Sequence, residues 1–469
     1  MRQTIARCGI FLCFALIVSW ASFSGAQLSA GVTFTSLASF SGTNGNDPLS
    51  IVQGADGKLW GVTVAGGTPN CGTVFNMTLA GKLTNGFTFK CSNGNEPQGL
   101  TLGTDGNYYG ITFRGGSNNR GIVFKLTAKG VLTALSNFMV EGSGGSSDPV
   151  GSLVQGIDGN FYGATSGGGI GSGAGTMFKI TPGGKLSTLY QFDYTHGSAP
   201  YAGPMEGTDG NFYGTTYSGG VYGAGTVYKM TPQGHLSVLY SFGGVSGGPL
   251  FPVTSLIQGT DGNFYGTTSY GGPDNDGTVY KITPGGALTV LHNFAQTDGR
   301  WPGGLVQATD GNFYGTTFYG GVYDGGTIFK VTATGTVTTL HSFHGTDGTG
   351  PATLIQNTNG TFYGITGAGG DLNCNPSVGC GTVFSLATGL GPFVETVPAI
   401  GTVGSPVIIL GTNLNGVTGV SFHGTAALFN VVSSSEIVTT VPTGARTGKV
   451  IVTTAKGTLS SNVVFKVAN

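Results

Sequence analysis

The residues with the most regular chemical pattern are carboxylates and aromatics in a repeated motif. "GTDGNFYG" stands at 207–214 and at 259–266, with close variants at 156–163 and 308–315. An acidic residue beside two aromatics could bind a ligand. The turn pair of the motif recurs seven times, at Asp56-Gly57, Asp105-Gly106, Asp158-Gly159, Asp209-Gly210, Asp261-Gly262, Asp310-Gly311 and Asn359-Gly360. A catalytic or metal-binding carboxylate would not tolerate the change to Asn359, whereas Asp-Gly and Asn-Gly both suit type I′ hairpin turns. The motif is therefore interpreted as scaffold.

The elements that carry these turns are short strands. Successive copies lie 49 to 53 residues apart, which is the period of propeller blades. The third copy contains four apolar, β-branched or aromatic segments, at 151–156, 161–166, 175–181 and 185–192. The last copy stops at 381–388 without a fourth segment, and an extra one, 32–40, precedes the first copy. The sequence predicts a seven-bladed β-propeller over 27–388, closed by strand 32–40.

Other residues that recur in each copy also have structural interpretations. The first strand carries an amide three residues before most turns (Gln53, Gln155, Gln258, Gln307 and Gln356, with Glu206 and Leu102 in the other copies). We expect these side chains to line a central channel or to bridge neighbouring blades, because buried polar groups need partners. The third-strand lysines are interpreted as solvated (Lys125, Lys179, Lys229, Lys281 and Lys330). His292 and His341 replace tyrosines of other copies and are interpreted as structural.

The best candidates for binding lie in the variable loops. The connections from second to third strand, and from one copy to the next, differ widely in sequence, and such loops on a rigid scaffold are where binding usually occurs. The candidate ligand-binding residues are Tyr217, Tyr222, Tyr270, Trp301, Phe318, Tyr319 and Tyr323. Charged residues lie among them, namely Asp274, Asp276, Asp324, Arg114, Arg120 and Arg300.

Exposed aromatics among small residues suit stacking on sugar rings or gripping an extended polymer. We therefore expect a binding or adhesion module whose partner is an extracellular polymer such as a polysaccharide, or a surface protein. A propeller-type polysaccharide lyase or glycoside hydrolase is one alternative, although no paired carboxylates or metal-ligand cluster stand out. A purely structural cell-surface protein is the other. The sequence predicts no catalytic residue, cofactor or metal.

Composition and the N-terminus indicate the compartment. Charged residues make up 8% of the 469 residues and the net charge is −1, which argues against nucleic-acid binding. Residues 1–26 have the pattern of a signal peptide, with Arg2 and Arg7 before an apolar run at 8–20. That run is shorter than the roughly 20 residues of a membrane span, although a retained anchor is the alternative. We expect a secreted or cell-surface monomer without a membrane span.

Four cysteines remain after the leader. Cys71 and Cys91 lie ten residues either side of Gly81, so an antiparallel hairpin would place them opposite each other. Cys374 and Cys380 share one loop. The sequence predicts disulfides Cys71–Cys91 and Cys374–Cys380. A Cys71–Cys380 pair between the first and last blades and a zinc site are the alternatives.

The repeat unit, "GLVQATDGNFYGTTFYGG…GGTIFKVT", resembles the GloVer tandem repeat of secreted bacterial choice-of-anchor proteins over about 32–388. This resemblance implies export and no particular activity. After a linker at 389–392, residues 393–469 resemble an IPT/TIG domain through "VIILGTNL", "VSFHGTAA" and "IVTTVPTGARTGKVIVTTAKG". That resemblance implies a small immunoglobulin-like sandwich, and alternating strands with Gly/Pro turns favour the same fold.

Overall fold

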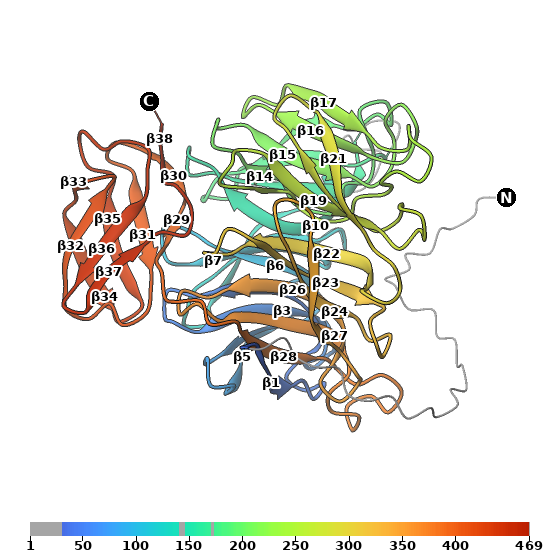
Figure 1. Ribbon diagram of the computed structural model, residues 1–469, viewed down its shortest axis with the longest axis horizontal. Helices are drawn as coiled ribbons and strands as arrows, with labels where there is room; N and C mark the ends of the chain where they lie inside the picture. Colours follow the sequence, from blue (N-terminus) through green and yellow to red (C-terminus); the bar gives the residue numbers. More distant parts are fainter. Residues whose placement is uncertain (1–30, 140–145, 170–172, 469) are drawn as a thin grey trace.

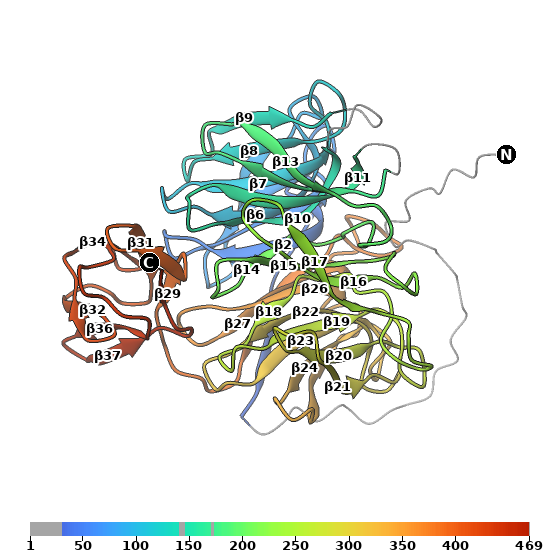
Figure 2. The same cartoon turned by 90° about the horizontal axis from the view of Figure 1, so that it is seen from above.

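The computed structural model describes residues 31–139, 146–169 and 173–468, and these form an all-β chain in two parts. Within them, seven four-stranded antiparallel sheets form a propeller, and two more four-stranded sheets with a short two-stranded one form a C-terminal sandwich. The red sandwich lies against one end of the propeller in both views (Figures 1 and 2). The leader expected at 1–26 lies outside the described residues.

The propeller strands fall into four sets by their position in each blade. The innermost strands are β2 (Asn46–Gln53), β6 (Asn95–Leu102), β10 (Ser146–Gln155), β14 (Met205–Glu206), β18 (Ile257–Gln258), β22 (Arg300–Gln307) and β26 (Thr349–Gln356). The second strands are β3 (Leu59–Ala65), β7 (Tyr108–Arg114), β11 (Phe161–Gly168), β15 (Phe212–Thr216), β19 (Phe264–Thr268), β23 (Phe313–Tyr319) and β27 (Phe362–Ala368). The third strands are β4 (Thr73–Met77), β8 (Ile122–Leu126), β12 (Thr176–Ile180), β16 (Thr226–Met230), β20 (Thr278–Ile282), β24 (Thr327–Val331) and β28 (Thr382–Ala387). The outer strands are β5 (Leu83–Thr88), β9 (Leu132–Asn137), β13 (Leu186–Gln191), β17 (Leu236–Ser241), β21 (Leu288–Asn293), β25 (Val337–Ser342) and β1 (Thr33–Ser39).

The ring closes through its N-terminal strand. β1 pairs antiparallel with β28, from Thr33 opposite Ala387 to Ser39 opposite Thr382. The seventh sheet therefore has the order β1-β28-β27-β26, and its outer strand lies within the segment 32–40. β1 thus gives the seventh blade a fourth strand like the others, and the closed ring leaves only the short outer edge of each blade.

The repeated turns differ from the type I′ expectation. In the first blade, Gly57 N–H donates to Gly54 O at 3.1 Å, and Gly57 has a φ of +73° whereas Asp56 is not left-handed. This is a type I turn followed by a left-handed glycine, the arrangement of a three-residue hairpin loop. The prediction of type I′ turns was wrong because only the second residue of each pair adopts positive φ.

The turn aspartates are occupied by structural partners. Asp209 accepts hydrogen bonds from Tyr213 Oη at 2.8 Å and from Asn211 Nδ2 at 2.8 Å, and it pairs with Lys229 at 2.9 Å. Burial alone would raise the pKa of Asp209, but these three donors lower it to about 2. Lys229 is thus a partner of the turn and not simply solvated. This confirms that the motif is scaffold.

Neighbouring blades stack through the aromatic pair of the motif. The first aromatic of one blade lies on the second aromatic of the preceding blade, with ring centroids 3.9–4.5 Å apart. The stacked pairs are Trp60–Tyr108, Tyr109–Phe161, Tyr162–Phe212, Tyr213–Phe264, Tyr265–Phe313 and Tyr314–Phe362. The two aromatics thus belong to two different seams between blades.

The first-strand amides form hydrogen bonds between neighbouring blades, which was one of the two roles expected for them. Gln258 Oε1 accepts the Thr208 N–H of the preceding blade at 2.8 Å, and its Nε2 donates to Gly262 O at 3.1 Å. Gln53, Gln155, Gln307 and Gln356 accept equivalent bonds, as does Glu206 from Ile157 at 3.2 Å. Leu102 cannot make this bond.

The C-terminal sandwich packs against the propeller at Leu102, where the bridging hydrogen bond is missing. Its strands are β29 (Glu395–Val397), β30 (Ile400–Thr402), β31 (Pro406–Leu410), β32 (Val417–Phe422), β33 (Thr425–Ala426), β34 (Phe429–Ser433), β35 (Glu436–Thr440), β36 (Val450–Thr454), β37 (Gly457–Ser460) and β38 (Lys466–Ala468). Ile408 and Leu410 join one apolar cluster with Leu102, and Ser435 Oγ donates to Ala55 O at 2.7 Å. The sandwich therefore caps the propeller face that carries the first-to-second-strand turns.

Both expected disulfides are present. Cys71 pairs with Cys91 and Cys374 with Cys380, with Cα atoms 5.2 and 6.0 Å apart. This excludes the Cys71–Cys380 alternative. No group of three potential metal-binding side chains occurs in the part of the chain that the structure describes. No helix within the same residues is long and apolar enough to cross a membrane.

A glycine–proline contact closes each seam, and it can be tested. Gly225 (φ +102°) precedes β16, and a Cβ there would clash with Thr216 O of its own blade and lie 2.9 Å from Cδ of Pro252 in the next blade. We expect Gly225→Ala to lose about 3 kcal/mol of unfolding free energy through strain and overpacking. Gly210→Ala is the control, because Gly210 has a φ of +75° but no atom near its Cβ position. We expect it to lose only about 1 kcal/mol. Equal losses in denaturant titrations would contradict close packing around Gly225, within its blade and at the seam.

Candidate binding face

The face opposite the sandwich carries the variable loops. The innermost strands end at the sandwich side, so their first residues lie at the other end of the propeller, beside the loops that precede the third strands (Figure 1). β2 contacts both β6 and β26, as expected of strands around a central axis. Residues that begin the innermost strands therefore surround the point at which the central axis of the propeller reaches this face, which we call the mouth.

A ring of seven equivalent residues defines this mouth. Each one precedes a proline, within the first residues of an innermost strand or, in blades four and five, six residues before it, and has a left-handed backbone, with φ between +51° and +61°. We call them the pre-proline ring: Asp47, Glu96, Asp148, Ala199, Phe251, Trp301 and Gly350. Each N–H donates to a carbonyl of the preceding blade, for example Trp301 to Asp276 O at 2.9 Å and Gly350 to Gly325 O at 3.0 Å. A backbone hydrogen bond to the preceding blade is thus common to all seven positions.

Five of the seven predicted aromatics gather beside this ring. Trp301 contacts Tyr270 and Tyr319, with ring centroids 5.6 and 5.2 Å apart, and Tyr319 contacts Phe318 at 4.7 Å. Tyr217 lies further along the same line. The contacts form a continuous row across blades four to six, which we call the aromatic row: Tyr201, Tyr217, Phe251, Tyr270, Trp301, Tyr319 and Phe318.

Two members of the row were missed by the sequence analysis. Phe251 lies between Tyr217 and Tyr270, with centroids 5.0 and 6.0 Å away, and Tyr201 is 5.0 Å from Tyr217. The signal for Phe251 was its place before Pro252, which matches Trp301 before Pro302. Tyr201 has no such signal, because it follows Pro200.

The structure does not bring the other two predicted aromatics to the row. Tyr222 lies over Gly243 and Gly244, which follow the outer strand β17. Tyr323 contacts His344, which follows β25, with ring centroids 5.5 Å apart. Both are exposed, but they lie at the periphery of their blades.

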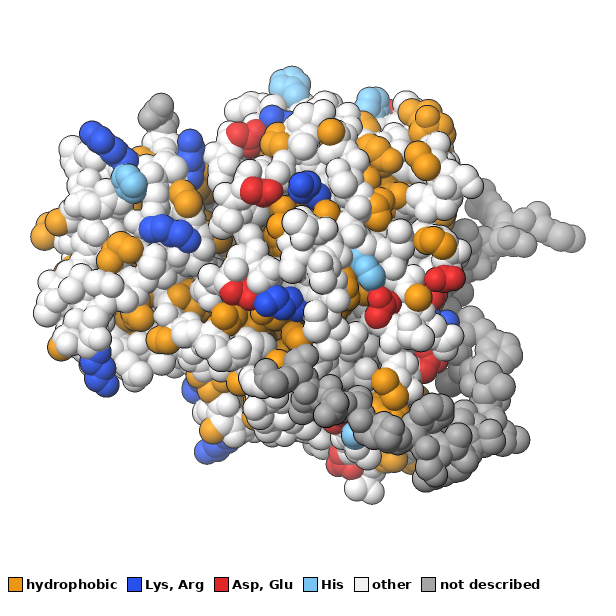
Figure 3. Space-filling model, viewed as in Figure 1, with side chains coloured by type: hydrophobic (Ala, Val, Ile, Leu, Met, Phe, Trp, Pro, Cys, Tyr) orange, Lys and Arg blue, Asp and Glu red, His pale blue; other side chains and the backbone are white. Residues whose placement is uncertain are grey.

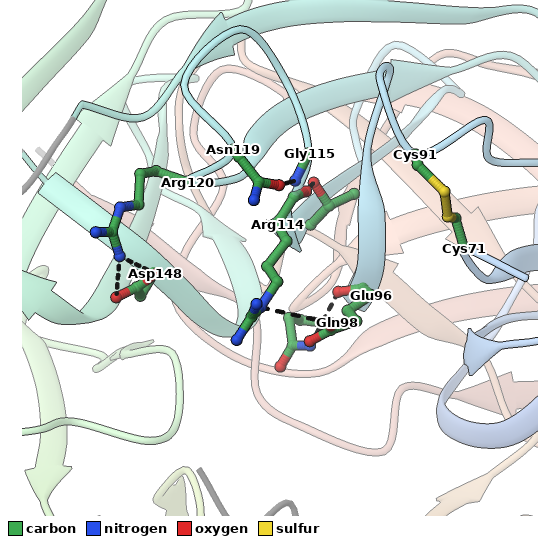
Figure 4. Close-up of polar contacts among 10 residues, drawn as sticks. Cys71, Cys91, Glu96, Gln98, Arg114, Gly115, Asn119, Arg120 and Asp148 are labelled. Carbon is green, nitrogen blue, oxygen red and sulfur yellow. Dashed lines mark hydrogen bonds and ion pairs between the residues drawn. A yellow bond between two sulfur atoms is a disulfide. The ribbon is translucent and has the colours of Figure 1, made fainter. Parts of the chain in front are cut away.

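Blades two and three present ion pairs where blades five and six present aromatics. Arg114 pairs with Glu96, Nε to Oε1, at 3.5 Å, and Arg120 Nη1 lies 3.5 Å from Asp148 Oδ2 (Figure 4). Arg114 faces Asn95 across the sheet, the position that Tyr319 holds opposite Arg300 in blade six. A cleft of about 350 Å³ opens here, lined by Arg114, Asn118, Asn119, Arg120 and Asp148.

The charged groups around the pre-proline ring have different surroundings in blade one and in blade six. Burial raises the pKa of Asp47 to about 6, and no hydrogen bond or ion pair of its carboxylate is present among the described residues. At the other end, the guanidinium of Arg300 lies 5.2 Å above the Tyr319 ring and pairs with Asp324 at 3.4 Å. Burial also raises the pKa of Tyr217 and Tyr319, so their hydroxyls stay protonated and can donate.

By fold the molecule is a seven-bladed β-propeller with one end capped by a sandwich and variable loops at the other. The sequence matches the Gloeobacter/Verrucomicrobia repeat over residues 26–207 and 149–384, and the chain belongs to that repeat family. Residues 393–467 match the IPT/TIG domain, which identifies the sandwich.

Solved structures show the same fold at low identity. Virginiamycin B lyase from Staphylococcus aureus aligns with a TM-score of 0.52 and 14% identity, covering 76% of this chain and 98% of its own. A fungal alcohol oxidase of the AA5 family, solved with copper, aligns with a TM-score of 0.51 and 14% identity, covering 94% of this chain and all of its own (100%). At these identities the likeness concerns the fold alone. No curated protein matches the chain.

The unpaired carboxylate of Asp47 predicts a pH effect. Folding raises its pKa from 3.8 to about 6, so its contribution to stability is greatest below pH 3.8 and is lost as pH rises through 6. The side chain of Asp47→Asn does not titrate, so we expect this variant to gain stability relative to the native chain between about pH 4 and 6. Chemical denaturation at several pH values measures it. Asp209→Asn is the contrast, because the lowered pKa of Asp209 predicts the opposite trend at acidic pH. A pH-independent difference for Asp47→Asn would contradict the raised pKa.

Proposed function

We propose that the protein is an exported binding module whose variable-loop face holds an extracellular polysaccharide chain. The aromatic row is the observation that carries this proposal. Its rings continue from blade four to blade six, and most are partly exposed, with 46% of Tyr201 accessible. Sugar rings have apolar faces that stack on aromatic side chains, and tyrosine and tryptophan add a hydrogen-bonding group.

The shape of the row favours an extended ligand over a compact one. A small ligand needs a concave pocket that buries most of its surface, whereas the row is a line of rings along the rim of three blades. An extended chain can contact successive rings. Each contact would be weak, and affinity would grow with the number of sugars that the row holds.

Two further features support export and recognition. Disulfides form and persist in oxidising compartments outside the cytoplasm, and both pairs lie in the propeller. Charged side chains are dispersed in the view of Figure 3, without a large patch of one sign, which suits a ligand bound by stacking and hydrogen bonds.

Substitutions in the row test the proposal. We expect Trp301→Ala and Tyr319→Ala each to weaken polysaccharide binding roughly three- to tenfold, the equivalent of about 0.5–1.5 kcal/mol for one aromatic contact. The melting temperature should change little, since both side chains are partly exposed. Calorimetry and affinity electrophoresis on plant and microbial polysaccharides measure binding.

Tyr222→Ala and Tyr323→Ala are matched controls, because both tyrosines are exposed but lie outside the row. They should bind like the native chain. If they weaken binding as much as the row variants, the row is not the site. If Trp301→Ala or Tyr319→Ala instead lowers the melting temperature sharply, these rings serve stability and the proposal fails.

A further inference from the structure

The pre-proline ring carries side chains that its architecture does not need. A left-handed backbone costs a residue with a Cβ about 1–2 kcal/mol, and glycine adopts it freely. Gly350 makes the inter-blade hydrogen bond as well as the others do, at 3.0 Å. Glycine would therefore serve the scaffold at all seven positions, yet only one of them has it. Phe251 and Trp301 are bulky residues for which positive φ is a rare outlier.

Polar and aromatic side chains occupy different parts of the pre-proline ring. Blades one to three carry the carboxylates Asp47, Glu96 and Asp148, and blades five and six carry the aromatics Phe251 and Trp301. Their neighbours at the ends of the second strands are sorted in the same way, with an arginine in blade two and tyrosines in blades five and six. The mouth thus has a polar half and an aromatic half.

We propose that the pre-proline ring selects a neutral, hydroxyl-rich sugar chain that crosses the mouth, stacking on Phe251 and Trp301 and hydrogen-bonding to the polar half. This proposal rests on the binding function proposed above and names its ligand class. It also assigns the cleft of about 350 Å³ beside Arg114 and Asp148 as the polar subsite.

The charges of the rim favour a neutral ligand. Glu96 and Asp148 are paired with arginines, and such pairs offer both acceptors and donors, which hydroxyl groups can use together. A polyanion would meet the carboxylate of Asp47, and a polycation would compete with the arginines for Glu96 and Asp148. Sugar hydroxyls require neither pair to break.

Glycine substitutions separate a recognition role from a structural one. Phe251→Gly and Trp301→Gly relieve the backbone strain while removing the aromatic side chain, so we expect at least fivefold weaker binding to a neutral polysaccharide. The unfolding midpoint of Trp301→Gly should change little, whereas that of Phe251→Gly should fall somewhat, because Phe251 also packs against the apolar cluster between blades four and five. Ala199→Gly is the matched control, since it makes the same backbone change at a ring position without a charged or aromatic group. It should bind like the native chain.

The polar half is tested with shape-conserving variants of the full chain. Asp47→Asn and Glu96→Gln keep the size of each side chain, and we expect each to weaken binding about threefold or more, because carboxylates are the stronger acceptors. The probes are a neutral β-glucan and a neutral galactomannan, with polygalacturonate as the polyanion and chitosan as the polycation. The native chain should prefer a neutral probe.

The outcomes distinguish the two proposals. If the native chain binds none of the polysaccharides, the proposed function fails and the ligand class with it. If it binds, but Phe251→Gly and Trp301→Gly behave like Ala199→Gly, only the role of the ring is overturned. Preference for polygalacturonate or chitosan overturns the neutral ligand class. A large loss of stability in both glycine variants would show that the aromatic side chains of Phe251 and Trp301 serve folding, which also overturns the proposal.

Discussion

The structure depends on one seam that must be made seven times. In a closed ring every blade packs against two others, so the contact surface has to be the same at each junction. Paired aromatics supply its core at six of the seven junctions. At all seven, a left-handed glycine meets a proline of the next blade at the loop end, as Gly225 meets Pro252. The amide bridge of residues such as Gln258 supplies its other end. These requirements explain why glycine, proline and the aromatic pair recur while most other positions vary.

The seam also explains where variation is permitted. The pre-proline residue contributes its backbone N–H to the seam, and Gly350 makes that bond without any side chain. The backbone bond therefore does not dictate which side chain stands there, although Phe251 also packs against the apolar cluster between blades four and five. Because the backbone is fixed by neighbours on both sides, any side chain placed there is held rigidly at the mouth of the axis. A rigid position with free choice of side chain is well suited to recognition.

The repeats contain most of the information about the fold and little about the site. Period, strand content and cysteine spacing predicted the propeller and both disulfides, because each depends on local sequence. The turn type was wrong because Asp-Gly occurs both in two-residue type I′ hairpins and in three-residue hairpins, and in the latter only the glycine has positive φ. Phe251 was missed although it precedes Pro252 as the predicted Trp301 precedes Pro302; the equivalence of the two positions is plain only once their shared left-handed backbone is seen. Tyr222 and Tyr323 were grouped with the row because sequence does not show on which side of a loop a side chain lies.

The place of the IPT/TIG domain follows from a break in the repeat. Six blades carry a hydrogen-bonding side chain at the bridge position, and the exception, Leu102, contacts Ile408 and Leu410 of the sandwich. An apolar side chain at this position adds to the apolar surface that the sandwich covers, so leucine suits a blade that is covered. The sandwich in turn occupies the turn face, on which the copies differ least. A propeller has two open ends, and capping the regular one leaves the variable loops, the aromatic row and the pre-proline ring as the end that can meet a ligand.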